Sequence, residues 1–181
     1  MGHKGENSKS FVECTPIVCY RSFSNLFVSV VNLQIVNNES SEIVCMLNSA
    51  FNEFAKNPEL DLSPAETVAA QDEVNSFIYP NINNGVYRCG FAKSQEAYDT
   101  AVEDLNESLE RVEGILAEKR YITGDKLTIA DIRLFVTLIR FDEVYVVYFK
   151  TNTKAIRESP NIFNYLRELS QLPEVKRTVS M

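Results

Sequence analysis

The segment from Thr128 to about Tyr148 constrains the fold more than any other part of the sequence. Its apolar residues point in nearly every direction around a helix, namely Ile129, Ala130, Ile132, Leu134, Phe135, Val136, Leu138, Ile139 and Phe141. A helix that is apolar on all sides has to be surrounded by other elements. The sequence therefore predicts a central, buried helix with other helices packed around it.

Amphipathic patterns on both sides of this segment predict the surrounding helices. Apolar residues recur at three- and four-residue steps over 43–54, 68–78, 98–116 and 162–169. Ser63-Pro64 and Ser159-Pro160 place a capping Ser and a Pro where two of these helices would begin. Residues 81–91 are rich in Asn and Gly and predict a loop. The expected architecture is an all-α bundle over residues 37–181.

The first 36 residues have a different character. Residues 1–10 are polar and are expected to be disordered. The β-branched and apolar run at 26–36 predicts one strand or a short hairpin around Asn32, which must pack on something to be stable. The predicted organisation is an atypical segment over 1–36, partly disordered, followed by a helical domain over 37–181.

Charge and composition restrict the partners. The chain has 18 basic and 25 acidic residues, so nucleic acid would repel it and an acidic membrane would find no basic cluster. No apolar run near the N-terminus approaches the ~20 residues that span a bilayer, and Glu6 and Glu13 argue against an export signal. With one His beside four cysteines, a metal site is not expected. We therefore expect a cytoplasmic protein with free thiols and no metal, nucleic-acid or membrane partner.

Thr128 and Asp131 have the spacing of a capping box at the start of the buried helix. The Thr side chain can accept a hydrogen bond from the backbone amide of residue 131, while the Asp carboxylate reaches back to the amide of Thr128. Such a box occurs in many helical proteins, so it identifies no family by itself.

The surrounding residues resemble a known family. Residues 121–131, Tyr-Ile-Thr-Gly-Asp-Lys-Leu-Thr-Ile-Ala-Asp, resemble the segment that begins the core helix in the C-terminal domain of glutathione transferases. Residues 83–92, 138–145 and 160–167 resemble the glutathionyl-hydroquinone reductases, the omega-like xi class of that family. The resemblance extends over 35–181 and implies the helical bundle of that C-terminal domain, preceded by a short β-strand remnant.

The resemblance also implies an activity. Members of the class use glutathione as co-substrate to remove the glutathionyl group from a hydroquinone, through a cysteine in a Cys-Pro-Trp/Phe motif. That motif is absent here, since Cys14 is followed by Thr15-Pro16, and the thioredoxin-like half that would carry it is not recognisable. We therefore assign no catalytic residue, keep Cys14 only as the least favoured nucleophile, and expect impaired activity. Whether the chain is an enzyme is left open.

Four ligand-binding positions follow from the resemblance. Glu39 and Ser40 match a helix start that holds the γ-glutamyl carboxylate of glutathione, where free amides and the helix dipole favour an anion. Tyr87 and Tyr145 match tyrosines that contact the hydroquinone oxygen, and a phenol can donate a hydrogen bond to a developing phenolate. The alternative for each tyrosine is a plain structural role in the core.

Two other interpretations stay open. The chain could be a non-catalytic helical binding or dimerisation module, since members of this class pair through their C-terminal domains, and a homodimer is expected. It could instead be an incomplete gene product whose full form carries the thioredoxin-like half. An extended transcript that encodes Cys-Pro-Trp/Phe upstream would select this last interpretation.

Overall fold

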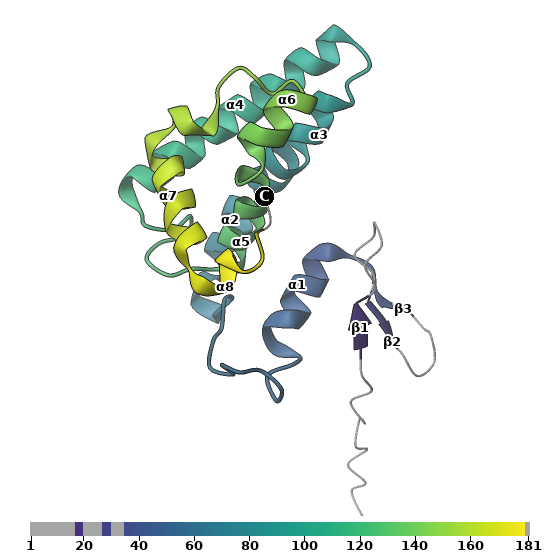
Figure 1. Cartoon of the computed structure of the whole chain (residues 1–181), viewed down its shortest axis with the longest axis vertical. Coiled ribbons are helices and arrows are strands. Elements are labelled where there is room, and N and C mark those ends of the chain that lie inside the picture. Colours follow the sequence, from purple (N-terminus) through teal and green to yellow (C-terminus); the bar gives the residue numbers. More distant parts are fainter. Residues whose placement is uncertain (1–16, 20–26, 30–34, 180–181) are drawn as a thin grey trace, which may run out of the picture. The chain divides into compact units, whose positions relative to one another are not determined.

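The computed structural model describes residues 17–19, 27–29 and 35–179 of the chain. These residues fall into two compact units, Met1–Pro58 and Glu59–Met181 (Figure 1). The second unit is helical and contains the predicted buried helix, so the all-α fold class with a short β remnant is confirmed.

The first unit contains three short antiparallel strands and one helix. Strands β1 (Ile17–Cys19), β2 (Phe27–Ser29) and β3 (Ile35–Asn37) form a sheet in the order β1-β2-β3. Strands β2 and β3 correspond to the hairpin predicted over 26–36, whereas β1 was not predicted because three residues are too few for a periodic pattern. The predicted turn at Asn32 and the predicted disorder over 1–10 lie outside the described residues.

Helix α1 (Ser40–Ser49) follows the sheet and is shorter than predicted. Its apolar stripe continues in the sequence to Phe54, but the Phe54 side chain is 68% exposed. Because most helical stability in proteins comes from burying an apolar face, the stripe gives no reason for the helix to continue.

The second unit is built from helices joined by short turns. Its α-helices are α2 (Val68–Ile78), α3 (Gly85–Gly90), α4 (Gln95–Glu118), α5 (Ile129–Leu138), α6 (Val146–Tyr148), α7 (Pro160–Gln171) and α8 (Pro173–Lys176). Single turns of 3₁₀- or π-helix are η1 (Ala65–Thr67), η2 (Tyr79–Asn83), η3 (Phe141–Tyr145) and η4 (Ile156–Glu158). No helix in the described part of the chain is long and apolar enough to cross a bilayer.

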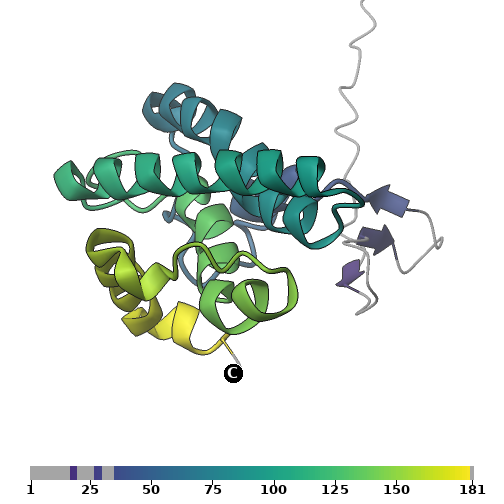
Figure 2. The same cartoon turned by 90° about the horizontal axis from the view of Figure 1, so that it is seen from above.

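Helix α4 runs along the helical unit and contacts α3 near its start and α7 on its side (Figure 2). Helix α5 contacts α2, α7 and the turns η2 and η3. Ala130 and Leu134 of α5 are completely buried, as predicted for a central helix. The prediction was too strong in one respect, since Val136 is 44% exposed and one side of α5 reaches the surface.

Helix α5 also ends earlier than the apolar pattern suggested. The guanidinium of Arg140 donates to the carbonyl oxygen of Val136, and the backbone N–H of Arg140 donates instead to Thr137, at 3.2 Å. A side chain that takes over a carbonyl in this way interrupts the regular i to i−4 ladder. The chain then continues through the π-helical turn η3, which carries Tyr145.

The prediction of a loop over residues 81–91 is wrong. This segment forms part of η2 and the whole of α3, and Ile82, Val86 and Cys89 are buried in the core. The Asn83 amide donates to the carbonyl oxygen of Arg133 at 2.9 Å and to the hydroxyl of Thr137 at 2.6 Å. Burial and these bonds to α5 outweigh the weak helix propensity of Asn and Gly.

The capping box of α5 is formed and extends further than the sequence indicated. The Asp131 carboxylate, fully buried, accepts from the amide and the hydroxyl of Thr128, both at 2.8 Å. It also accepts from the amide of Ile122 at 2.9 Å and the hydroxyl of Tyr165 at 3.0 Å. Burial raises the pKa of Asp131, and these hydrogen bonds oppose the rise. One side chain thus joins the turn after α4, the start of α5 and the middle of α7.

Replacing Asp131 by Ala should lower the free energy of unfolding by about 2–4 kcal/mol. The substitution leaves several buried donors unpaired, and each such group costs about 1–3 kcal/mol. Urea denaturation of the full chain measures the effect. Asp125→Ala is the matched control, because Asp125 is exposed in the same turn and its loss should cost no more than ~0.5 kcal/mol. Equal midpoints for the two variants would show that the network contributes nothing.

Candidate functional site

The structure brings the two predicted hydroquinone-binding tyrosines together. Tyr87 lies on α3 and Tyr145 at the end of η3, 58 residues further along the chain, and their hydroxyl oxygens are 3.3 Å apart. Their rings meet edge to face, with centroids 5.8 Å apart and planes at 71°. The pairing depends on α3 being a helix rather than the loop that the sequence suggested.

The two phenols differ in exposure. Tyr145 is 6% exposed, whereas Tyr87 is 45% exposed. Burial raises the pKa of Tyr145 to about 12, and the hydrogen bond to Tyr87 adds to the rise. Like an ordinary tyrosine, Tyr145 is protonated at neutral pH and can donate to an oxygen. Because each hydroxyl is both donor and acceptor, one phenol can orient the other toward a ligand oxygen on the open side.

Further aromatic rings surround this pair. The rings in contact with it or with one another are those of Tyr87, Phe91, Phe141, Tyr145 and Phe149, which we call the aromatic cluster. The sequence analysis did not predict Phe91 and Phe149 as part of a site. A signal was available, because each follows a site tyrosine by four residues, a spacing that places two side chains on one helical face.

Glu39 and Ser40 lie in the first compact unit, at the start of α1. The Glu39 carboxylate accepts from the amide of Ser41 at 3.3 Å and from its hydroxyl at 3.2 Å. Glu39 therefore acts as the N-cap of α1 in this structure. That these two residues bind glutathione stays a prediction.

The structure describes the side chains of two cysteines, Cys89 and Cys45. Cys89 is buried on α3, and burial raises the pKa of its thiol, which disfavours the nucleophilic thiolate. Cys45 is an exposed free thiol on α1. Cys14 lies outside the described residues. No group of three or more His, Cys, Asp or Glu side chains arranged for a metal ion occurs in the part that the structure describes.

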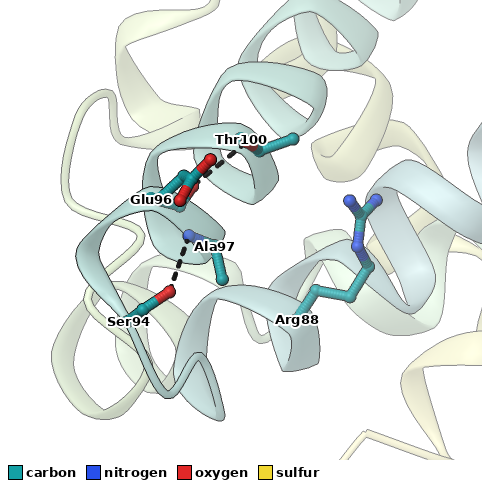
Figure 3. Close-up of a pocket in the computed structure, with 5 residues that line it drawn as sticks. All are labelled: Arg88, Ser94, Glu96, Ala97 and Thr100. Carbon is teal, nitrogen blue, oxygen red and sulfur yellow. Dashed lines mark hydrogen bonds between the residues drawn. The ribbon is translucent and has the colours of Figure 1, made fainter.

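An open cavity of about 450 Å³ lies where α3 faces the start of α4 (Figure 3). Ser94 caps α4 by accepting from the amide of Ala97 at 3.2 Å, and Glu96 and Thr100 line the same wall. Arg88, which could have bound a substrate carboxylate, pairs with Asp104 at 2.9 Å. Arg88 and Ser94 of this cavity therefore already have partners.

A second cavity, of about 420 Å³, is lined mainly by residues of α5, η3 and α7. Its charged residues include Asp142, whose carboxylate accepts from the amides of Ile156 and Arg157 at 2.7 and 3.2 Å. Neither cavity is lined by Tyr87 or Tyr145. The tyrosine pair combines one buried and one accessible phenol.

Comparison with known proteins shows what the chain is similar to. Residues 95–168 match the family described as "Glutathione S-transferase, C-terminal domain". The chain is 48% identical over 149 residues to glutathionyl-hydroquinone reductase YqjG of Escherichia coli (strain K12), covering 82% of this chain and 45% of that protein. It is 43% identical over 151 residues to glutathionyl-hydroquinone reductase PcpF of Sphingobium chlorophenolicum, covering 83% of this chain and 48% of the relative.

Solved structures of glutathione transferases are also similar to this chain. The glutathione-bound structure of YqjG superimposes with a TM-score of 0.82 at 46% identity, over 86% of this chain and 50% of that one. Glutathione transferase Xi 1 from Trametes versicolor has a TM-score of 0.82 at 45% identity, over 86% of this chain and 55% of that one. The chain spans about half the length of the curated relatives it matches.

The helical unit of the chain therefore has the fold of a glutathione S-transferase C-terminal domain. Within the family, its similarity is to the glutathionyl-hydroquinone reductases and the xi-class transferases, which confirms the resemblance seen in the sequence.

The Tyr145 phenol should remain protonated at pH ~10, where an ordinary tyrosine is half ionised. Replacing Tyr87 by Phe should lower the pKa of Tyr145, because the hydrogen bond between the two phenols contributes to the rise and would be lost while the effect of burial remains. The NMR chemical shift of the Tyr145 ring carbon that bears the hydroxyl reports the ionisation of this phenol. Tyr148→Phe, which removes a 73% exposed phenol nearby in sequence, should leave the Tyr145 signal unchanged. A Tyr145 that is half ionised at pH ~10 in the wild type would contradict the assignment.

Proposed function

We propose that the helical unit supplies the hydroquinone side of a glutathione-dependent reductase of glutathionyl-hydroquinones. The observation that carries the proposal is the 3.3 Å contact between the hydroxyl oxygens of Tyr87 and Tyr145. The relatives named as glutathionyl-hydroquinone reductases support the same substrate class. Glutathione is the expected co-substrate, with Glu39 and Ser40 as its predicted contacts.

The tyrosine pair suits the chemistry of a phenolic leaving group. When the bond between sulfur and the aromatic carbon breaks, electron density moves onto the ring and its oxygens. A phenol that stays protonated at neutral pH can donate to that oxygen, and a hydrogen bond to a charged group contributes about 1.5–3 kcal/mol. Tyr145 would hold the orientation of Tyr87, and Tyr87 would meet the substrate from the accessible side.

We expect neither Cys89 nor Cys45 to supply the cysteine nucleophile that such a reaction needs. Cys89 is buried with a raised thiol pKa, and Cys45 on α1 is not followed by Pro as in the motif of the class. The free thiols of both support a reducing, cytoplasmic setting. We therefore expect the 181-residue chain to bind hydroquinones and to turn over their glutathionyl adducts negligibly.

Removing either phenol should weaken the binding of benzene-1,4-diol. Tyr87→Phe and Tyr145→Phe each keep the ring and delete one hydroxyl, so each should lower affinity about threefold to tenfold, the value of one ordinary hydrogen bond. NMR titration of the full chain measures the dissociation constants. Tyr148→Phe is the matched control and should bind as the wild type does.

One result would overturn the proposed function, and a second would overturn the expectation of negligible turnover. The first is affinity for benzene-1,4-diol that survives the loss of both hydroxyls in a Tyr87→Phe, Tyr145→Phe double variant. The second concerns the nucleophile, tested with glutathione and a glutathionyl-hydroquinone. Robust turnover by the 181-residue chain that disappears in Cys14→Ser would show that Cys14, the candidate we consider least favoured, is the nucleophile.

A second candidate function is association through the helical unit. Val147 and Tyr148, adjacent residues of α6, are 63% and 73% exposed. Exposed apolar residues that lie together mark surfaces for association, and two-fold pairing is the commonest outcome. These residues support a homodimer formed by the helical unit.

Sedimentation of the wild-type chain at tens of micromolar should show a dimer. A Val147→Asp, Tyr148→Asp double variant should shift the equilibrium toward monomer, because two charges would have to be buried in the interface. Thermal unfolding of the variant checks that it remains folded. A wild type that sediments as a clean monomer would exclude this function.

A further inference from the structure

Phe149 contacts three of the other four rings of the aromatic cluster. Its ring centroid is 5.3 Å from that of Tyr87, 5.4 Å from that of Phe91 and 5.4 Å from that of Tyr145. It therefore adds a second link between α3 and η3 to the direct contact of Tyr87 with Tyr145. These distances and tilts are typical of favourable aromatic contacts.

Gly90 makes room for this ring. A Cβ atom added to Gly90 would lie 2.5 Å from Cγ, 2.7 Å from Cδ1 and 2.9 Å from Cβ of Phe149. Contacts under 3.0 Å require one of the two groups to move. The glycine is therefore needed for the close approach of the Phe149 ring, and not for an unusual backbone angle.

The backbone of Phe149 is fixed from both sides. Its amide donates to the carbonyl oxygen of Tyr145 at 3.0 Å, and the amide of Thr151 donates to the same oxygen at 3.3 Å. Between them, Lys150 has a φ of 61°, and its carbonyl oxygen accepts from the hydroxyl of Tyr98 at 2.6 Å. This tight turn leaves Phe149 little freedom to retreat from Gly90.

Phe91 is the exposed member of the cluster. Its side chain is 69% exposed, and its ring is nearly parallel to that of Tyr87, at 18° with centroids 6.4 Å apart. A single exposed apolar residue needs no explanation. Phe91 differs because its ring contacts those of Tyr87 and the half-buried Phe149, so that a flat ligand with a ring hydroxyl could contact the Tyr87 phenol and the Phe91 ring at once.

We propose that Phe91 is a specificity-determining residue of the hydroquinone site, and that Phe149, seated against Gly90, is the residue that positions it. The ring of an aromatic acceptor lies against Phe91 while its oxygen meets the Tyr87–Tyr145 pair. The site therefore selects flat aromatic acceptors over saturated rings that carry the same hydroxyls. This inference rests on the proposed function and adds the selection for planarity.

The test compares two ligands that differ in the ring alone, benzene-1,4-diol and cyclohexane-1,4-diol. Phe91→Leu in the full chain should weaken benzene-1,4-diol about threefold to tenfold, the range expected for one aromatic contact, and leave the weaker binding of cyclohexane-1,4-diol unchanged. Phe91→Tyr restores an aromatic ring and should restore the preference. Gly90→Ala should reduce the preference without removing any ring, because it displaces Phe149.

Phe163→Leu is the matched control. Phe163 is a 41% exposed residue of α7 that lies outside the cluster, so its loss should not change the preference between the two diols. Thermal unfolding of each variant checks folding. Should Gly90→Ala fail to fold, Phe149→Leu tests the same positioning role by removing the ring and creating no clash.

The possible outcomes separate this inference from the proposed function. If the Tyr→Phe variants weaken benzene-1,4-diol and Phe91→Leu does not, the proposed function stands and this inference is overturned. If Phe91→Leu removes the preference while the Tyr→Phe variants have no effect, the ring contact stands and the role of the phenols fails. A wild-type chain that binds both diols equally, or neither, overturns the selection for planarity.

Discussion

The buried carboxylate of Asp131 is the interaction on which the helical unit depends most. It accepts hydrogen bonds from the turn after α4, from the first residue of the α5 capping box and from Tyr165 on α7. A buried carboxylate is costly unless its oxygens are fully bonded, so these three segments are held in one arrangement. Helix α5 begins at this capping box, and its residues contact α2, α7 and η3.

The position of the tyrosine pair follows from this arrangement in two steps. The Asn83 side chain donates to the carbonyl of Arg133 and the hydroxyl of Thr137 on α5. These bonds fix η2 and so the start of α3, which follows it in the chain. Arg140 takes the carbonyl of Val136, which ends α5 and allows the π-helical turn that carries Tyr145. The two hydroxyls meet because both of their elements are set by α5.

The predicted ligand residues belong to two separate parts of the molecule. Tyr87 and Tyr145 are joined within the helical unit, whereas Glu39 and Ser40 begin α1 in the first unit. The division matches the two chemical tasks of the proposed reaction. The phenols act on the oxygen of the aromatic acceptor, and a helix start is suited to the carboxylate of glutathione.

The sequence by itself determined the helical class, most helix positions and the capping box, because these depend on apolar periodicity and on residues a few positions apart. Thr128 and Asp131 were sufficient to predict where α5 begins, and Ser159-Pro160 to predict the start of α7. The two site tyrosines were assigned by resemblance, since nothing in local pattern distinguishes them from core residues.

Only the tertiary structure decided that residues 85–90 are helical, that α5 stops at Leu138 and that Phe149 fills the space beside Gly90. Local propensity favoured a loop around Asn83 and Gly85, and burial of Val86 and Cys89 against the core outweighed it. The contact between Tyr87 and Tyr145 crosses 58 residues of sequence, so no periodic pattern encodes it. It arises from the way that α3 and η3 pack together.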